Sequence, residues 1–97
     1  MIKYPHQGDL SYLSASIRRA MEDLTVPELI SIFGWFTKEG VNLYFYLSEP
    51  VSEQSEEELY CISTEVVSDF HKFWISETFA QKKPENRFDM VEVYAPK

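Results

Sequence analysis

The residues that could carry out acid–base or metal chemistry gather in the second half of the sequence. Glu58, Glu65, Asp69 and His71 follow one another at spacings that allow several of them to share a helix face. Acid–base catalysis needs one carboxylate desolvated beside a pocket, and metal binding needs ligands that converge from several elements. A solvated acidic helix face explains the same residues without either activity. A small hydrolytic or metal-dependent enzyme is therefore the least favoured of three hypotheses.

Other reactive residue types are few. Cys61 is the only cysteine, and it has acidic neighbours where a reactive thiol needs a base and positive surroundings. We expect it to be a small packing residue of a helix. His71 is interpreted as complementing a helix end, and His6, beside Pro5, has no functional pattern. The three glycines are scattered, so no phosphate-binding loop is expected. The sequence predicts no cofactor and no metal.

The negative charge of the chain is concentrated in one segment. The 97 residues carry a net charge of −7, and the acids between residues 49 and 69 have no Lys or Arg among them. These seven equal the net charge, because the rest of the chain has as many bases as acids: Glu49, Glu53, Glu56, Glu57, Glu58, Glu65 and Asp69. Such a segment repels phosphate backbones and attracts a basic partner. Direct nucleic-acid binding is not expected.

The elements that must position these residues can be read from the hydrophobic pattern. An apolar stripe predicts a first helix that begins after Asp9 and ends before Pro27: Leu10, Leu13, Ile17, Met21 and Leu24. Residues 28–37 and 41–47 are rich in β-branched and aromatic residues and predict a hairpin. Gly40 lies in its turn and can adopt a positive φ.

The acidic segment is predicted to form the second helix. Ser52 or Ser55 can cap it, and Glu58 would complete a capping box with Ser55. Its apolar stripe runs from Leu59 through Ile62, Val66 and Phe70 to Phe73, so the helix should have about 18 residues. Residues 73–79 and 88–94 are expected to be the last two strands. The sequence thus predicts a single α+β domain over 1–97, ordered α-β-β-α-β-β, with an antiparallel four-stranded sheet and both helices packed on one face.

Aromatic residues make up 15% of the chain, which is more than so small a core can hide. In the strand at 41–47, Val41, Leu43, Phe45 and Leu47 alternate with Asn42, Tyr44 and Tyr46, so the tyrosines share the face opposite the core. That face is either a solvated sheet surface or a binding surface, because periodicity does not separate the two.

Several segments resemble bacterial immunity proteins of contact-dependent growth inhibition and colicin-like toxin systems. The similar stretches are residues 17–30, the strand at 43–46, the acidic helix start at 50–58, the run Thr64-Glu-Val-Val-Ser-Asp-Phe70 and the closing Val91-Glu-Val-Tyr94. The resemblance implies a protein that binds and neutralises a cognate toxin domain, often a nuclease. The basic active cleft of a nuclease would suit the acidic segment.

The leading hypothesis is therefore an immunity protein, not an enzyme, that binds its toxin through the seven acids and through aromatic anchors: Trp35, Tyr44, Tyr46 and Tyr60. The alternative is a structural or adaptor protein that forms a homo-oligomer through the tyrosine face. As an immunity protein the chain would be a monomer or weak dimer when free. The single cysteine, and the absence of a signal peptide or an apolar run of transmembrane length, predict a cytoplasmic location without a membrane partner.

Overall fold

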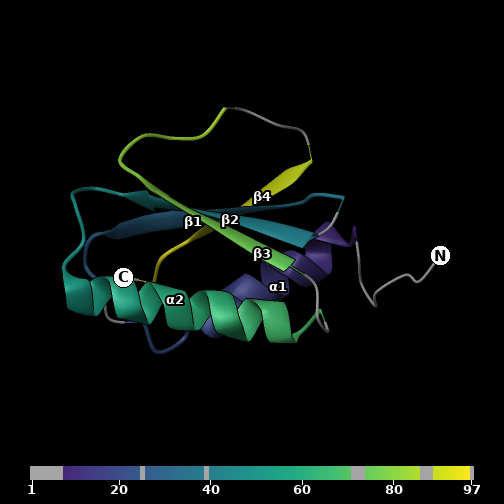
Figure 1. Cartoon of the computed structure of the whole chain (residues 1–97), viewed down its shortest axis with the longest axis horizontal. Helices are drawn as coiled ribbons and strands as arrows, with labels where there is room; N and C mark the ends of the chain where they lie inside the picture. Colours follow the sequence, from purple (N-terminus) through teal and green to yellow (C-terminus); the bar gives the residue numbers. More distant parts are fainter. Residues whose placement is uncertain (1–7, 25, 39, 71–73, 86–88, 97) are drawn as a thin grey trace.

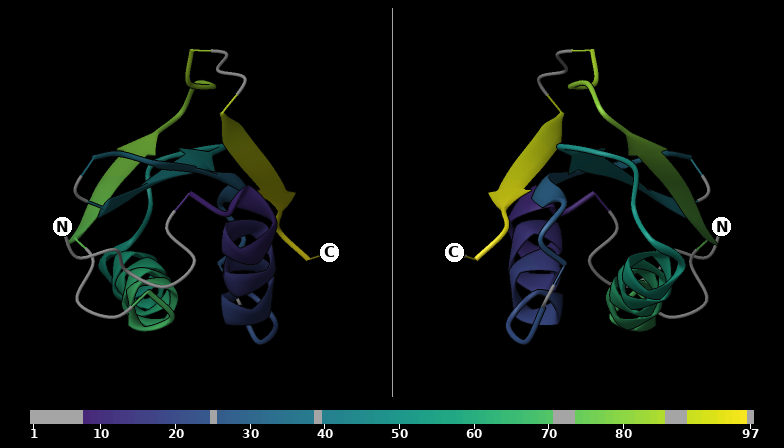
Figure 2. Two further views of the ribbon diagram at one scale, coloured as in Figure 1. Left: turned by 90° about the vertical axis from the view of Figure 1, so that its right-hand side faces the viewer. Right: turned by 90° about the vertical axis from the view of Figure 1, so that its left-hand side faces the viewer.

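The computed structural model describes residues 8–24, 26–38, 40–70, 74–85 and 89–96. Two helices and four strands follow one another in the predicted order: α1 (Leu10–Ala20), β1 (Leu29–Phe36), β2 (Gly40–Leu47), α2 (Glu53–Ser68), β3 (Trp74–Ala80) and β4 (Met90–Tyr94). The strands form one sheet, and both helices cover the same face of it (Figures 1 and 2).

The prediction of a purely antiparallel sheet is wrong. The strand order is β3-β2-β1-β4, and β1 pairs antiparallel with both β2 and β4, but β2 and β3 are parallel. The reason is the helix between them: α2 carries the chain back along the sheet, so β3 begins at the same end as β2. The sheet is mixed, with β3 and β4 as its two edges.

Local signals explain where α1 begins and ends. Asp9 caps it by accepting a hydrogen bond from the Tyr12 amide at 3.0 Å. The helix ends at Ala20, one turn before the predicted end, and Met21 is its C-cap. The predicted stripe is confirmed at its centre, because Leu13, Ile17 and Met21 are buried, while Leu10 and Leu24 are only partly buried.

The N-terminus of α2 depends on Ser52, whose hydroxyl accepts from the Ser55 amide at 3.1 Å. Of the two predicted caps, Ser52 is therefore the correct one. The buried stripe Leu59, Ile62, Val66 and Phe70 is confirmed, and Phe73 lies outside the described residues. The helix is shorter than predicted and ends at Ser68.

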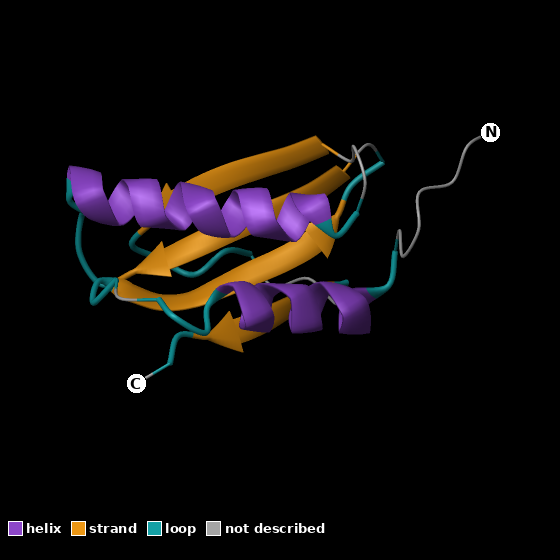
Figure 3. Ribbon diagram, turned by 90° about the horizontal axis from the view of Figure 1, so that it is seen from below, coloured by secondary structure: helices purple, strands orange, loops and turns teal. Residues whose placement is uncertain are grey.

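The two helices lie side by side and each covers its own half of the sheet. Figure 3 shows α2 along the β3 side and α1 along the β4 side. The contacts agree, since α1 packs against β1 and β4 while α2 packs against β3. The core between them includes Ile32 and Phe45 from the sheet and Leu13 and Leu59 from the helices.

Gly40 is required for a reason that the sequence analysis missed. Its φ is not positive. Among the glycines in the described part of the chain, only Gly8 has a positive φ. Instead, a Cβ at Gly40 would overlap the backbone carbonyl of Trp74 on the neighbouring strand. Glycine is therefore needed because β2 and β3 approach closely here.

Candidate functional site

The seven acids of residues 49–69 lie in the helix layer or at its edge. Five are on α2: Glu53, Glu56, Glu57, Glu58 and Glu65. Glu49 follows β2, and Asp69 is the C-cap of α2. Acids in the first turn suit the positive end of the helix, which explains locally why so negative a segment is helical. The seven residues therefore belong to one element and its two flanks.

They do not share one face of that element. Glu58 and Glu65 line the groove between α2 and α1, together with Asp23 and Ala20. Glu56 is half-buried and lies near Tyr60, whose ring contacts the β3 residue Phe79. Glu53 and Glu57 are exposed. The charge therefore wraps around α2, and a partner that covers one side of the helix meets only some of it.

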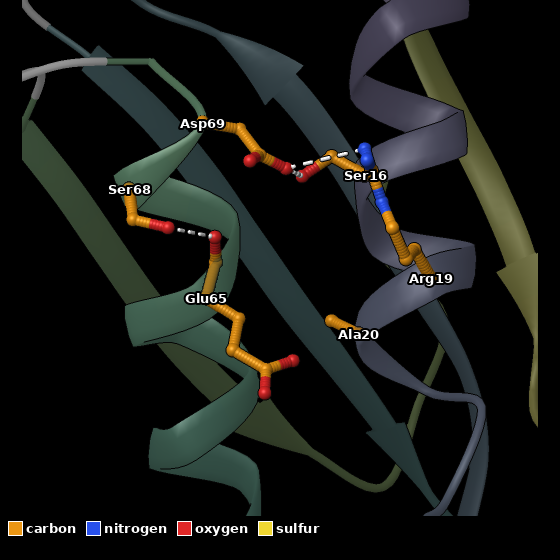
Figure 4. Close-up of a pocket in the computed structure, with 6 residues that line it drawn as sticks. All are labelled: Ser16, Arg19, Ala20, Glu65, Ser68 and Asp69. Carbon is orange, nitrogen blue, oxygen red and sulfur yellow. Dashed lines mark hydrogen bonds and ion pairs between the residues drawn. The ribbon is translucent and has the colours of Figure 1, made fainter.

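Asp69 is part of an internal tie between the helices. Its Oδ2 accepts a hydrogen bond from the Ser16 hydroxyl at 2.6 Å and pairs with Arg19 at 3.3 Å. Figure 4 shows both partners reaching from α1 toward Asp69, with Glu65 one turn away along α2. Ser16 is buried, whereas the Arg19 side chain is 59% exposed. The geometry gives Asp69 a structural role in joining α1 to α2.

One buried carboxylate, Glu28, escaped the sequence analysis. It precedes β1 and is only 7% exposed. Its Oε1 accepts from the Ser55 hydroxyl at 3.3 Å and its Oε2 from the Ser52 amide at 3.4 Å. The hydrogen bond to its own backbone amide, followed by those to Ser55 and Ser52, lowers its pKa below 4.5, although burial acts in the opposite direction. Glu28 therefore anchors the N-terminus of α2. The sequence around Glu28, which follows Pro27, does not predict this contact.

The predicted aromatic anchors are divided between two faces. Tyr60 lies on α2 with the acids and is 43% exposed. Trp35, Tyr44 and Tyr46 lie on the face of the sheet away from the helices, because their neighbours along β1 and β2 are core residues. The structure thus brings Tyr60 to the acidic residues and separates Trp35, Tyr44 and Tyr46 from them.

Residues 81–85, which follow β3, lie on the helix-free side of the sheet (Figure 2). Tyr44 holds them in place by donating a hydrogen bond from its hydroxyl to the Lys82 carbonyl at 2.6 Å. A pocket of about 530 Å³ lies beside this bond, lined by Trp35, Tyr44, Thr78, Lys82, Lys83, Pro84 and Glu85. This face therefore carries aromatic side chains with lysines beside them, in contrast to the acidic helix layer.

The remaining reactive residues do not assemble into a catalytic or metal centre in the part of the chain that the structure describes. No group of three or more His, Cys, Asp and Glu side chains lies close enough there to hold a metal ion. His71 and His6 lie outside the described residues. Cys61 is exposed at the rim of the α1–α2 groove, so the prediction that it is a small packing residue of the helix is wrong. The buried stripe of α2 does not include it. None of the described helices is long and apolar enough to cross a membrane.

A comparison with protein families gives one match that covers most of the chain. The model of a family described as MafI2 immunity protein matches residues 11–94, which include all four strands, the whole of α2 and all of α1 except Leu10. Comparison with curated proteins gives no match.

Proposed function

This chain belongs to the MafI2 immunity protein family, and we propose that it neutralises its cognate toxin by binding the toxin domain through the acidic surface of α2. Membership of the family gives it the role of a toxin-neutralising immunity protein and points to an inhibitor that is not itself an enzyme. We also propose which surface binds the toxin domain, that this domain is basic and that it is a nuclease. A cytoplasmic location of the immunity protein is likewise our proposal.

The observation that carries the proposal is the composition of α2. Its exposed side presents Glu53, Glu57 and Glu65, and no Lys or Arg occurs anywhere in residues 49–69. A toxin domain that binds nucleic acid needs a basic cleft to hold phosphates, and a row of carboxylates on a rigid helix offers that cleft a complementary charge. Opposite charges also speed association, which favours capture of the toxin before it acts.

The division of the aromatic residues restricts what such an interface can contain. A toxin that covers the acidic side of α2 can also contact Tyr60, but not Trp35, Tyr44 and Tyr46 on the other side of the sheet. We therefore propose Tyr60 as the aromatic anchor of the acidic interface. The other three belong to a different surface, the pocket-bearing face beneath Lys82 and Lys83.

Binding of the purified toxin domain at low and at high salt tests the proposal. Reversing Glu57, Glu58 and Glu65 to lysine should slow association about 10- to 100-fold at low salt and leave dissociation less affected. Glu57→Lys should slow it more than Glu85→Lys, which makes the same change in net charge on the opposite face. Unchanged association in the triple variant would rule out the acidic surface. Tight binding that does not respond to salt would transfer the interface to the aromatic face.

A second candidate function, self-association, is favoured by two exposed aromatic residues. Trp74 is 75% exposed and Tyr94 is 66% exposed, and both lie on edge strands with side chains on the helix-free face. Exposed aromatics of this size are typical of interfaces. The mass of the free protein in solution tests this: a stable dimer or larger assembly supports an adaptor, and a monomer supports the immunity protein acting alone.

A further inference from the structure

One carboxylate of the sheet faces the helix layer with a buried oxygen atom that has no hydrogen-bond partner. In β3 the residues that point toward the helices are Ile75, Glu77 and Phe79, because they pair with the core residues Val41, Leu43 and Phe45 of β2. Glu77 is thus the charged member of an otherwise apolar row. Its Oε2 atom is buried and makes no hydrogen bond. A desolvated carboxylate oxygen without a partner is unfavourable, and such groups call for an explanation in function.

The surroundings of Glu77 add negative charge. Desolvation raises the pKa of Tyr60 above 10.0, and the charges of Glu56 and Glu77 raise it further. Both carboxylates therefore lie close enough to act on the same hydroxyl. Glu56 is one helical turn before Tyr60 on α2, while Glu77 approaches from β3. Tyr60 thus lies between α2 and β3, with one carboxylate near it on each of these elements; we call this place the α2–β3 corner.

The ring of Tyr60 is held in position at this corner. It makes an edge contact with Phe79, with ring centres 5.4 Å apart, and Phe79 stacks on the fully buried Phe45 at 5.0 Å. The remaining side of Tyr60 is open to solvent, since the residue is 43% exposed. Glu77 is itself only partly buried, so part of its side chain is open to solvent, although its Oε2 atom is buried.

We propose that Glu56, Tyr60 and Glu77 form a receptor for an arginine side chain of the toxin domain. This inference rests on the proposed function and names its anchor. A guanidinium is flat and carries several donors, so it can stack on the tyrosine ring and donate to a carboxylate at the same time. Its charge would compensate that of Glu77, whose buried Oε2 atom has no hydrogen-bond partner.

A simpler role exists for Glu77 alone. An inward-pointing charge on an edge strand discourages pairing with a strand of another molecule. The two roles predict different effects on toxin binding. As an edge protector, Glu77 would limit self-association and leave toxin affinity unchanged, whereas as part of the arginine receptor it must contribute to the affinity.

The test is Glu77→Gln, measured both free and with the toxin domain. We expect the free variant to be about as stable as the wild type, because glutamine keeps the size of the side chain while its charge is removed, and the complex to dissociate about ten-fold faster or more. Glu85→Gln is the matched control, since it makes the same charge change on the helix-free face, away from α2, and it should alter dissociation less than about two-fold. If Glu77→Gln dissociates like the wild type, the receptor is wrong and the edge role stands.

Two further variants keep the test decisive if Glu77→Gln aggregates. Glu56→Gln and Tyr60→Ser change the same corner from the exposed side of α2, and each should also speed dissociation about ten-fold. Normal dissociation in both would overturn the receptor. The two proposals fail differently: a wild type that does not bind the toxin domain refutes the proposed function, whereas tight wild-type binding with unaffected corner variants refutes only the receptor.

Discussion

Replacing Asp69 with alanine removes the acceptor that joins the two helices. The Ser16 hydroxyl donates to Asp69 at 2.6 Å from a buried position, so the variant leaves a buried hydroxyl without its partner. Loss of a hydrogen bond to a charged group, with the unpaired donor left behind, costs about 1–3 kcal/mol. Ser16 lies within α1 and can instead donate to a carbonyl of the preceding turn, which keeps the cost near the middle of that range, at about 2 kcal/mol.

The ion pair adds little to this figure. The Arg19 side chain is 59% exposed, and water and salt screen its charge. Arg19→Ala should therefore lower the free energy of unfolding by no more than about 0.5 kcal/mol. Ser16→Ala should cost about 1 kcal/mol, because the Asp69 side chain, at 29% exposed, can still bind water. Because Ser16 and Asp69 are hydrogen-bonded to each other, the double variant Ser16→Ala/Asp69→Ala should lose less free energy of unfolding than the sum of the two single variants.

Urea unfolding at pH 7 measures these differences. For a domain of this size, a loss of about 2 kcal/mol also lowers the Tm by about 8–16 °C. Asp69→Asn is the control, because an amide oxygen can still accept from Ser16 while the charge is removed. The reasoning is refuted if Arg19→Ala is as destabilising as Asp69→Ala, since the tie would then be electrostatic, or if the effects at Ser16 and Asp69 add in full.

Other predictions follow from the glycines and from the two titrating groups. Gly40→Ala should destabilise the protein by about 2–4 kcal/mol, because its Cβ would meet the rigid backbone of Trp74. Gly34→Ala should cost less, about 1–3 kcal/mol, since its Cβ would lie 2.9 Å from the adjustable side chain of Ile17. Equal losses of stability for the two variants in urea unfolding would contradict this difference. The pKa of Glu28 is lower in the folded protein than its usual 4.5, so its stabilising effect is present above pH 4.5 and is lost as the pH falls through the folded value. Glu28→Gln should therefore reduce the loss of stability at acidic pH. An unchanged loss would contradict the role of Glu28. The pKa of Tyr60 is higher than 10.0 in the folded protein, so stability should fall as the pH rises past 10 and through the folded pKa; Tyr60→Phe should remove that part of the loss in the same experiment.

Much of the fold could be predicted because local signals agree with the final packing. The stripe through Leu13 and Ile17 and the alternation of Val41, Leu43 and Phe45 identify core residues without any knowledge of their partners. The direction of β3 could not be obtained in this way. Period-two alternation fixes which side chains share a face, but not whether the strand runs parallel or antiparallel to its neighbour. The connection through α2 decides that, and the close approach of Gly40 to Trp74 is its consequence.

The candidate site was harder to predict, because a list of acids does not show what each acid faces. Seven carboxylates looked equivalent in the sequence, yet Asp69 is used to join the helices, and Glu58 and Glu65 face α1. Glu28, which is buried, and Glu77, which has a buried oxygen atom, lie outside the acidic segment altogether. Both are adjacent to α2 in space, through β1 and β3. Glu28 has its hydrogen-bond partners within the chain, whereas the buried oxygen of Glu77 has none. That difference is the physical basis for separating Glu28, which stabilises this fold, from Glu77, which we propose to act in binding the toxin.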